Sequence, residues 1–116
     1  MTAQVVCQTR DLDPGEAMRL ELVRGLDDIV EIALVRDDFG DWHAIDDECT
    51  HGQVSLSDGD VDGTTIMCWL HGSEFDLVSG QPLSLPAIVP VNVYPVTIEG
   101  ENVLVDVNVT VNSQEK

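Results

Sequence analysis

The stretch Cys49–His71, CTHGQVSLSDGDVDGTTIMCWLH, contains most of the residues in this chain that ligate transition metals. It begins with the pair Cys49 and His51 and ends with the pair Cys68 and His71, and sixteen residues separate the two pairs. Two of the three cysteines and two of the three histidines therefore lie in one window. Thiolate and imidazole ligands suit zinc, copper or an iron–sulfur cluster better than magnesium or calcium. The stretch predicts a metal centre.

The residues around each pair indicate one shared site. Gly52 and Gly72 directly follow the two histidines, so each loop can bend past a metal without a Cβ clash. The Asp- and Gly-rich segment 58–63 is typical of a hairpin turn, which would place the two pairs opposite each other.

Three interpretations of the pairs compete. The first is no metal at all, with ordinary core cysteines and surface histidines. The second is a structural zinc site with two Cys and two His ligands, but common zinc fingers pair Cys with Cys and His with His. The third is a 2Fe-2S centre in which two histidines replace two cysteines on one iron. The mixed pairing favours the third interpretation and leaves the others open.

Length and composition predict one globular domain over residues 1–116. Apolar residues make up 43% of the 116, enough for a modest core. No apolar run approaches the roughly 20 residues that cross a bilayer, and the N-terminus lacks a basic start followed by a long apolar block. Three cysteines without an export signal do not predict a disulfide framework. We therefore expect a cytoplasmic protein that does not bind membranes.

The charge of the chain is strongly acidic. Five basic residues stand against 22 acidic ones, for a formal net charge of −17. No Lys or Arg occurs between Arg36 and Lys116. This excludes nucleic acid as a partner, because phosphate binding needs a basic surface. An acidic surface suits either transient docking on a basic patch of another protein or solubility alone.

The pattern along the chain is that of an all-β protein. His43 falls between the inward candidates of its strand, so we expect it on the surface. Cys7, far from the other cysteines, is expected to be a small buried hydrophobe. Three prolines make the segment 81–90 a stiff, extended connection. We expect strands at 5–9, 18–22, 29–35, 42–46, 64–67, 75–78 and 91–98, and a hairpin over 97–107 with Gly100 at its turn.

The ligand pattern and its continuation resemble the Rieske iron–sulfur family. The pattern is Cys-x-His, sixteen residues, then Cys-x-x-His, and the resemblance continues to about residue 107. The supporting residues are Gly72-Ser73, Phe75-Asp76, Ser79-Gly80 with the proline-containing loop, and Tyr94-Pro95-Val96. The resemblance implies that Cys49 and Cys68 bind one iron of a single 2Fe-2S cluster, and that His51 and His71 bind the other. It also implies an antiparallel β-sandwich or partly open barrel with a loop-rich cluster-binding subdomain at about 45–86.

Departures from the family pattern narrow the subtype. High-potential respiratory members carry an additional disulfide-bonded cysteine in each ligand loop, and these loops have none. Those members also have a Tyr where this chain has Phe75, although the hydroxyl of Ser73 is retained. Fewer hydrogen bonds to sulfur lower the reduction potential of a cluster. The negative charges of the three acids at 46–48, just before the first ligand, should lower it further. The chain thus resembles the small ferredoxins of bacterial aromatic-ring-hydroxylating dioxygenases, such as the biphenyl and carbazole types.

The resemblance implies a one-electron carrier without catalytic residues of its own. It would pass electrons from a flavin-dependent ferredoxin reductase to a terminal Rieske non-haem iron oxygenase, and we expect a monomer. A small Rieske-like subunit of a nitrite reductase is the alternative within electron transfer. A zinc-stabilised binding module is the alternative from another class.

Overall fold

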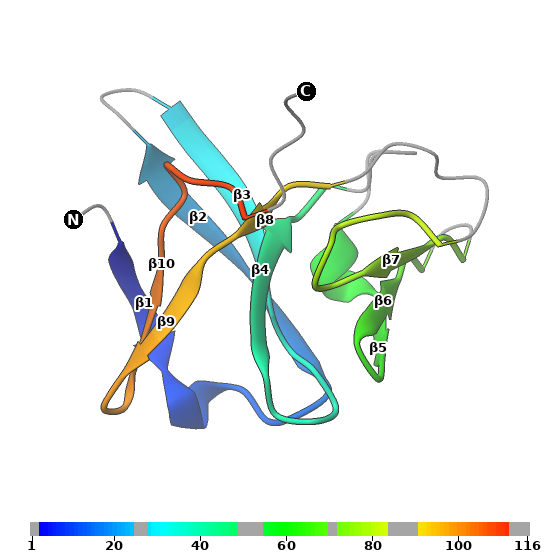
Figure 1. Cartoon of the computed structure of the whole chain (residues 1–116), viewed down its shortest axis with the longest axis horizontal. Coiled ribbons are helices and arrows are strands. Elements are labelled where there is room, and N and C mark those ends of the chain that lie inside the picture. The colour runs from blue at the N-terminus through cyan, green and yellow to red at the C-terminus, as the bar shows by residue number, and fades with distance from the viewer. Residues whose placement is uncertain (1–2, 25–27, 49–54, 70–71, 84–90, 112–116) are drawn as a thin grey trace.

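The computed structural model describes residues 3–24, 28–48, 55–69, 72–83 and 91–111. Its regular elements are short strands and two 3-10 turns, η1 and η2 (Figure 1). In chain order they are β1 (Gln4–Gln8), η1 (Thr9–Asp11), β2 (Glu16–Arg24), β3 (Asp28–Arg36), β4 (Trp42–Asp46), η2 (Leu56–Asp58), β5 (Asp60–Asp62), β6 (Thr65–Met67), β7 (Glu74–Asp76), β8 (Val93–Tyr94), β9 (Val96–Glu99) and β10 (Asn102–Val105).

The strands form three antiparallel sheets. The central sheet has the order β2-β3-β4-β8, the outer sheet β1-β10-β9, and the small sheet β5-β6-β7. The central sheet lies between the other two (Figure 1). This all-β architecture confirms the predicted fold class, and the hairpin around Gly100 is present as β9 and β10.

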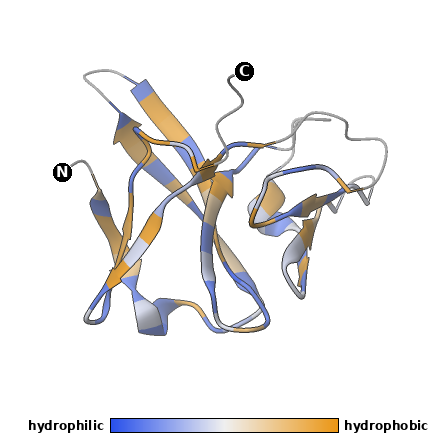
Figure 2. Ribbon diagram, viewed as in Figure 1, coloured by the Kyte–Doolittle hydropathy of each residue, from blue (hydrophilic) through white to orange (hydrophobic). Residues whose placement is uncertain are grey.

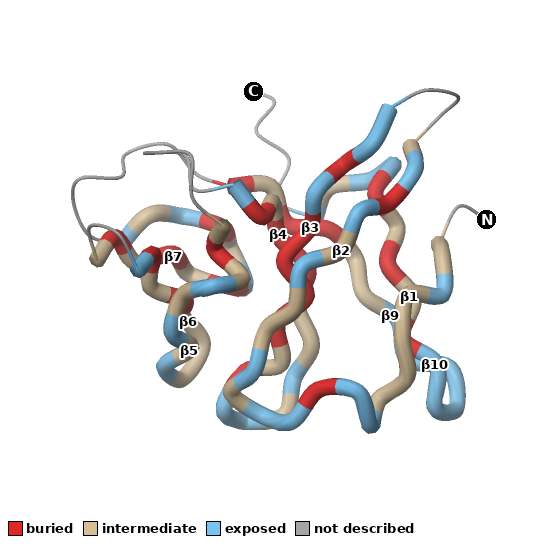
Figure 3. The backbone as a smooth tube through the Cα atoms, turned by 180° about the vertical axis from the view of Figure 1, so that it is seen from behind, coloured by how far each residue is buried: buried red, intermediate tan, exposed pale blue. Residues whose placement is uncertain are grey.

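Both faces of the central sheet are covered, because successive side chains of a strand point to opposite faces. On β3, Ile32 and Leu34 pack in a core with Val103 and Val105 of the outer sheet. The alternate residues Ala33 and Val35 belong to a second core, toward the small sheet. Hydrophobic residues therefore follow one another along much of β3 (Figure 2), and buried residues concentrate on β3 and β4 when the molecule is seen from behind (Figure 3).

The second core joins the small sheet to the central sheet. Ile66, Phe75 and Leu77 have no exposed surface, and they share this core with Ile45 and Val93 among other buried residues. Burying each such aliphatic or aromatic side chain contributes about 1.5–3 kcal/mol. The small sheet, whose strand β6 precedes the second ligand pair, is thus held by apolar packing against the central sheet, whose strand β4 precedes the first ligand pair.

Sequence patterns predicted most strands within one or two residues, with three informative differences. The segment 58–63, expected to be a hairpin turn, instead contains strand β5, which pairs with β6, and the turn between the two strands lies at residues 63–64. The strand expected over 75–78 ends at Asp76, because that carboxylate accepts hydrogen bonds from the hydroxyl and backbone N–H of Ser79 and turns the chain. The prediction that His43 lies on the surface is wrong. Its side chain is only 12% exposed, because β4 is an interior strand with both faces covered.

Two further expectations have a structural outcome. Cys7 is partly buried and packs against the core beneath the outer sheet. Burial raises the pKa of its thiol, and the nearby negative charge of Asp11 raises it further. Among the residues that the structure describes, no helix has the length and apolar character to span a membrane.

Candidate metal centre

The second ligand pair begins at Cys68, directly after β6. The backbone N–H of Cys68 donates to the carbonyl of Ser73 at 2.7 Å, and the N–H of Gly72 donates to the carbonyl of Cys68 at 2.9 Å. Gly72 has a φ of +75°, a left-handed conformation that glycine adopts without Cβ strain. Backbone hydrogen bonds from residue 68 to residues 72 and 73 therefore join the two ends of the segment that carries the Cys-x-x-His pair.

Cys68 itself is fully buried and is not in a disulfide. It shares the second core with Ile66 and Phe75. A buried free sulfur at the base of a tight loop fits a thiolate ligand shielded from water. Phe75 is a core side chain with no exposed surface.

The first ligand pair, Cys49 and His51, lies outside the described residues, but both flanks of its loop are described. Glu48 and Ser55 form an antiparallel bridge. The N–H of Leu56 donates to the carbonyl of Asp47, and the N–H of Ser57 donates to Oδ1 of Asp47 at 2.9 Å. Entry and exit of the loop 49–54 are therefore held together.

Asp46, just before the first ligand pair, holds the chain that follows the proline-rich segment. Its Oδ1 accepts a 2.7 Å hydrogen bond from the Tyr94 hydroxyl, and its Oδ2 accepts a 3.0 Å bond from the N–H of Asn92. Burial and the hydrogen bond to Asp46 raise the pKa of Tyr94. Residues 84–90, which include Pro86 and Pro90, lie outside the described residues, and Asp46 anchors the chain just after them.

Of the four predicted ligands, Cys68 lies among the described residues, and Cys49, His51 and His71 lie outside them. The described residues contain no group of three or more Cys, His, Asp or Glu side chains that would hold a metal. The chemistry of the one described ligand, a buried free thiol, nevertheless fits iron. Trp69, the residue after Cys68, is 54% exposed and is not a core residue.

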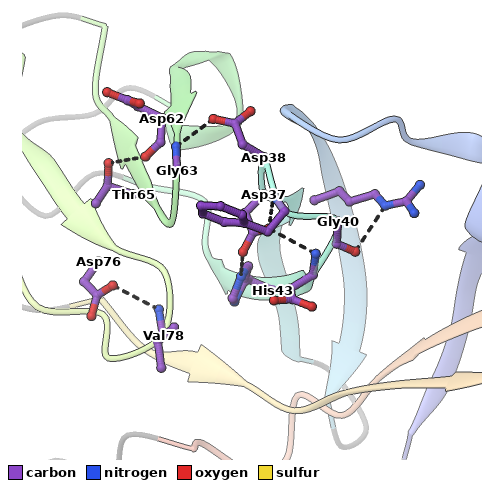
Figure 4. Close-up of polar contacts among 12 residues, drawn as sticks. Asp37, Asp38, Gly40, His43, Asp62, Gly63, Thr65, Asp76 and Val78 are labelled. Carbon is purple, nitrogen blue, oxygen red and sulfur yellow. Dashed lines mark hydrogen bonds and ion pairs between the residues drawn. The ribbon is translucent and has the colours of Figure 1, made fainter.

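Sequence reasoning missed a polar joint between the β3–β4 turn and the small sheet (Figure 4). Oδ2 of Asp38 accepts a 2.7 Å hydrogen bond from the N–H of Gly63, and the N–H of Asp38 donates to the carbonyl of Gly63 at 3.3 Å. Beside it, Nε2 of His43 donates to Oδ2 of the fully buried Asp37 at 2.8 Å. The Asp-Asp-x-Gly hairpin signal marked the turn, but nothing in the sequence showed that it contacts the turn at 62–63.

Hydrogen bonding decides the ionisation of Asp37. Burial opposes the charged form, but hydrogen bonds from His43 and from the N–H groups of Asp41 and Phe39 outweigh burial and lower the pKa of Asp37. The buried carboxylate is thus stabilised as an anion at the joint.

Comparison with known proteins identifies the family. Residues 2–95 match the family model of the Rieske [2Fe-2S] domain. The chain is 38% identical over 107 residues to the biphenyl dioxygenase ferredoxin subunit of Pseudomonas sp. (strain KKS102), covering 91% of this chain and 93% of that protein. A chain in the complex of reduced oxygenase and oxidized ferredoxin in carbazole 1,9a-dioxygenase matches with a TM-score of 0.77 and 37% identity, covering 88% of this chain and 99% of that chain.

A third match lies in another electron-transfer system. The structure of a putative NADH-dependent nitrite reductase small subunit from Mycobacterium tuberculosis matches with a TM-score of 0.74 and 27% identity, covering 89% of this chain and 92% of that chain. Its identity is lower than that of the dioxygenase ferredoxins.

The chain belongs to the Rieske [2Fe-2S] domain family. Its cofactor is accordingly a Rieske-type 2Fe-2S cluster, which sets aside the interpretations with zinc and with no metal. Within the family it is a ferredoxin of the kind found in aromatic-ring dioxygenase systems, an electron carrier and not the catalytic oxygenase.

Proposed function

We propose that Cys49 and Cys68 hold one iron of the cluster and His51 and His71 the other. The observation that carries this assignment is the buried, free Cys68 in its hydrogen-bonded turn. The bridge between Glu48 and Ser55 supports it, because it closes the loop that carries the other pair. When bound, the cluster supplies a centre that accepts and releases one electron.

The residues around Cys68 position this ligand and shield it from water. The second core excludes water from the sulfur of Cys68. The backbone bonds from residue 68 to residues 72 and 73 restrict the position of Cys68. Small rearrangement on gaining or losing one electron is what a carrier between two proteins requires.

The carrier takes its electron from a flavin-dependent reductase and delivers it to the terminal oxygenase of an aromatic-ring-hydroxylating dioxygenase. Support for the oxygenase comes from the matched complex of oxygenase and ferredoxin. Support for weak, charge-steered docking comes from the net charge of −17. Three exposed apolar side chains, Trp69 in the second ligand segment and Val78 and Leu83 beside β7, add apolar contact area for a partner. We propose that the carrier acts as a cytoplasmic monomer.

Reconstitution tests this function. The purified holoprotein is combined with a flavin reductase, NADH and the terminal oxygenase of a biphenyl or carbazole system, and ring hydroxylation is measured. NADH oxidation coupled to hydroxylation, and dependent on this protein, is the expected result. Electron transfer that supports nitrite reduction and not ring hydroxylation would favour the second candidate, a nitrite reductase subunit, which the 27% identical Mycobacterium tuberculosis structure supports.

A further inference from the structure

Asp47 holds both ends of the first ligand loop. Its N–H donates to the carbonyl of Glu31 on β3 at 3.0 Å, which fixes the entry of the loop to the central sheet. Its own carbonyl and Oδ1 accept hydrogen bonds from the N–H groups of Leu56 and Ser57, at the exit of the loop. Asp47 therefore joins the residues before the segment 49–54 to the residues after it.

The carboxylate of Asp47 is buried and incompletely hydrogen-bonded. Its side chain has no exposed surface, and Oδ2 has no hydrogen-bond partner among the described residues. The nearest cationic group is the guanidinium of Arg19, whose Nε lies 3.5 Å from Oδ2. A buried carboxylate without a nearby positive charge is strongly unfavourable, so this contact compensates the charge of Asp47.

Arg19 is held in place by two other carboxylates. Glu21 and Glu31 stand directly opposite each other on β2 and β3, an arrangement in which like charges repel. Nη2 of Arg19 donates to both, at 2.9 Å and 2.8 Å. The hydrogen bond to Glu31, and to a smaller extent the one to Glu21, raises the pKa of Arg19. The guanidinium of Arg19 thus contacts three carboxylates: its Nη2 bonds to Glu21 and Glu31, and its Nε faces Asp47.

We propose that Arg19 is a positioning residue for the first ligand pair: by compensating the buried charge of Asp47, it keeps the two flanks of the segment 49–54 together and raises the reduction potential of the cluster. The inference rests on the proposed assignment of Cys49 and His51 as ligands. Arg19 is thirty residues before Cys49 in sequence and reaches the loop only through the pairing of β2 with β3.

The test compares two arginines in the holoprotein. Arg19→Gln is expected to lose its cluster about tenfold faster in mild denaturant, the factor that corresponds to one strong hydrogen bond or ion contact. Its reduction potential is expected to shift negative. Arg10→Gln is the matched control, because it removes the same charge from a single exposed pair with Glu101 in the turn after β1. Equal effects of the two variants on cluster loss and potential would overturn the proposal.

A double variant tests whether Arg19 acts through Asp47. Asp47→Asn keeps an oxygen acceptor for the N–H of Ser57 but removes the buried charge. In that background Arg19→Gln should change cluster loss and potential much less than it does alone. Full additivity of the two substitutions would overturn the proposal. Failure of the ligand assignment has a different signature, since His51→Ala would then leave the 2Fe-2S absorption spectrum unchanged.

Discussion

Oδ1 of Asp46 accepts a 2.7 Å hydrogen bond from the hydroxyl of Tyr94, and this bond joins the strand before the first ligand loop to the strand after the proline-rich segment. The next residue, Asp47, uses its carboxylate on the opposite face of the chain to hold the exit of the ligand loop. Two consecutive acids therefore fix different segments, because alternate residues of an extended chain point in opposite directions. Asp46 and Asp47 therefore stabilise the fold through hydrogen bonds and not only through their charge.

Tyr94→Phe removes this hydrogen bond and leaves the rest of a buried side chain intact. We expect the free energy of unfolding to fall by about 2 kcal/mol, as for the loss of a hydrogen bond to a charged group. Denaturant titration of the holoprotein measures it. Thr97→Val, on the exposed strand β9, is the control and should change stability by less than about 0.5 kcal/mol. Equal stability of Tyr94→Phe and the parent would contradict the assigned role.

The joint at Asp37 predicts a dependence on acid pH. Because the folded protein lowers the pKa of Asp37 relative to the unfolded chain, the stabilisation is fully present above pH ~4 and is lost as pH falls through the lower, folded pKa. We expect Asp37→Asn to be about 2 kcal/mol less stable at pH 7. Below pH ~4 its deficit relative to the parent should shrink. Unfolding measured from pH 7 to pH 3 checks this.

The control for Asp37 is Asp13→Asn, which changes an exposed carboxylate. Its stability should track that of the parent across the same pH range. A deficit of Asp37→Asn that stays constant down to pH 3 would show that the carboxylate stabilises the joint by shape and not by charge.

Gly59 predicts a steric requirement beside the second ligand pair. A Cβ at Gly59 would lie far inside contact distance of the carbonyl oxygen of Met67, the residue before Cys68. Gly59→Ala should therefore displace β6, lower stability by at least about 2 kcal/mol and reduce the cluster content. Melting temperature and iron content per chain measure both effects.

Gly100→Ala is the matched control for Gly59. Gly100 has a φ of +63° and open space around it, so alanine there adds only the cost of a left-handed backbone, about 1 kcal/mol. Its cluster content should equal that of the parent. Comparable iron loss in both glycine variants would refute the steric argument.

The ligand assignment predicts a sharp division among cysteines and histidines. Cys68→Ser and His71→Ala should abolish or reshape the 2Fe-2S absorption and electron paramagnetic resonance spectra. Cys7→Ser and His43→Gln should retain them, because Cys7 packs against the other core and His43 bonds to Asp37. A parent-like spectrum from His71→Ala would disprove its role as a ligand.

The acidic surface predicts a salt effect on electron uptake. Raising the ionic strength from about 0.02 to 0.3 M should slow reduction of this protein by its flavin reductase, because salt screens long-range attraction between charged surfaces. Stopped-flow absorbance records the rate. Reduction by a small neutral reductant is the control and should be nearly insensitive to salt. Equal salt dependence in both reactions would remove the steering argument.

The amino-acid sequence alone determined the kind of centre and the class of fold. The cluster was predicted from two mixed Cys and His pairs, the sixteen residues between them and the Gly72-Ser73 that follows. This was possible because side-chain chemistry sets which metal centre a ligand set binds. Alternating apolar residues and turn signals placed most strands, since strand period and turn residues are local properties.

Only the tertiary structure decided which polar residues act inside the molecule. The 22 acidic residues look alike along the chain, yet burial selects Asp37 and Asp47. His43 was placed on the surface by its alternation, but a sheet covered on both faces has no solvent side for an interior strand. Arg19 reaches Asp47 through pairing between strands, a contact that depends on register and not on local sequence. Burial and register arise from how the sheets pack, and the local pattern of residues does not contain them.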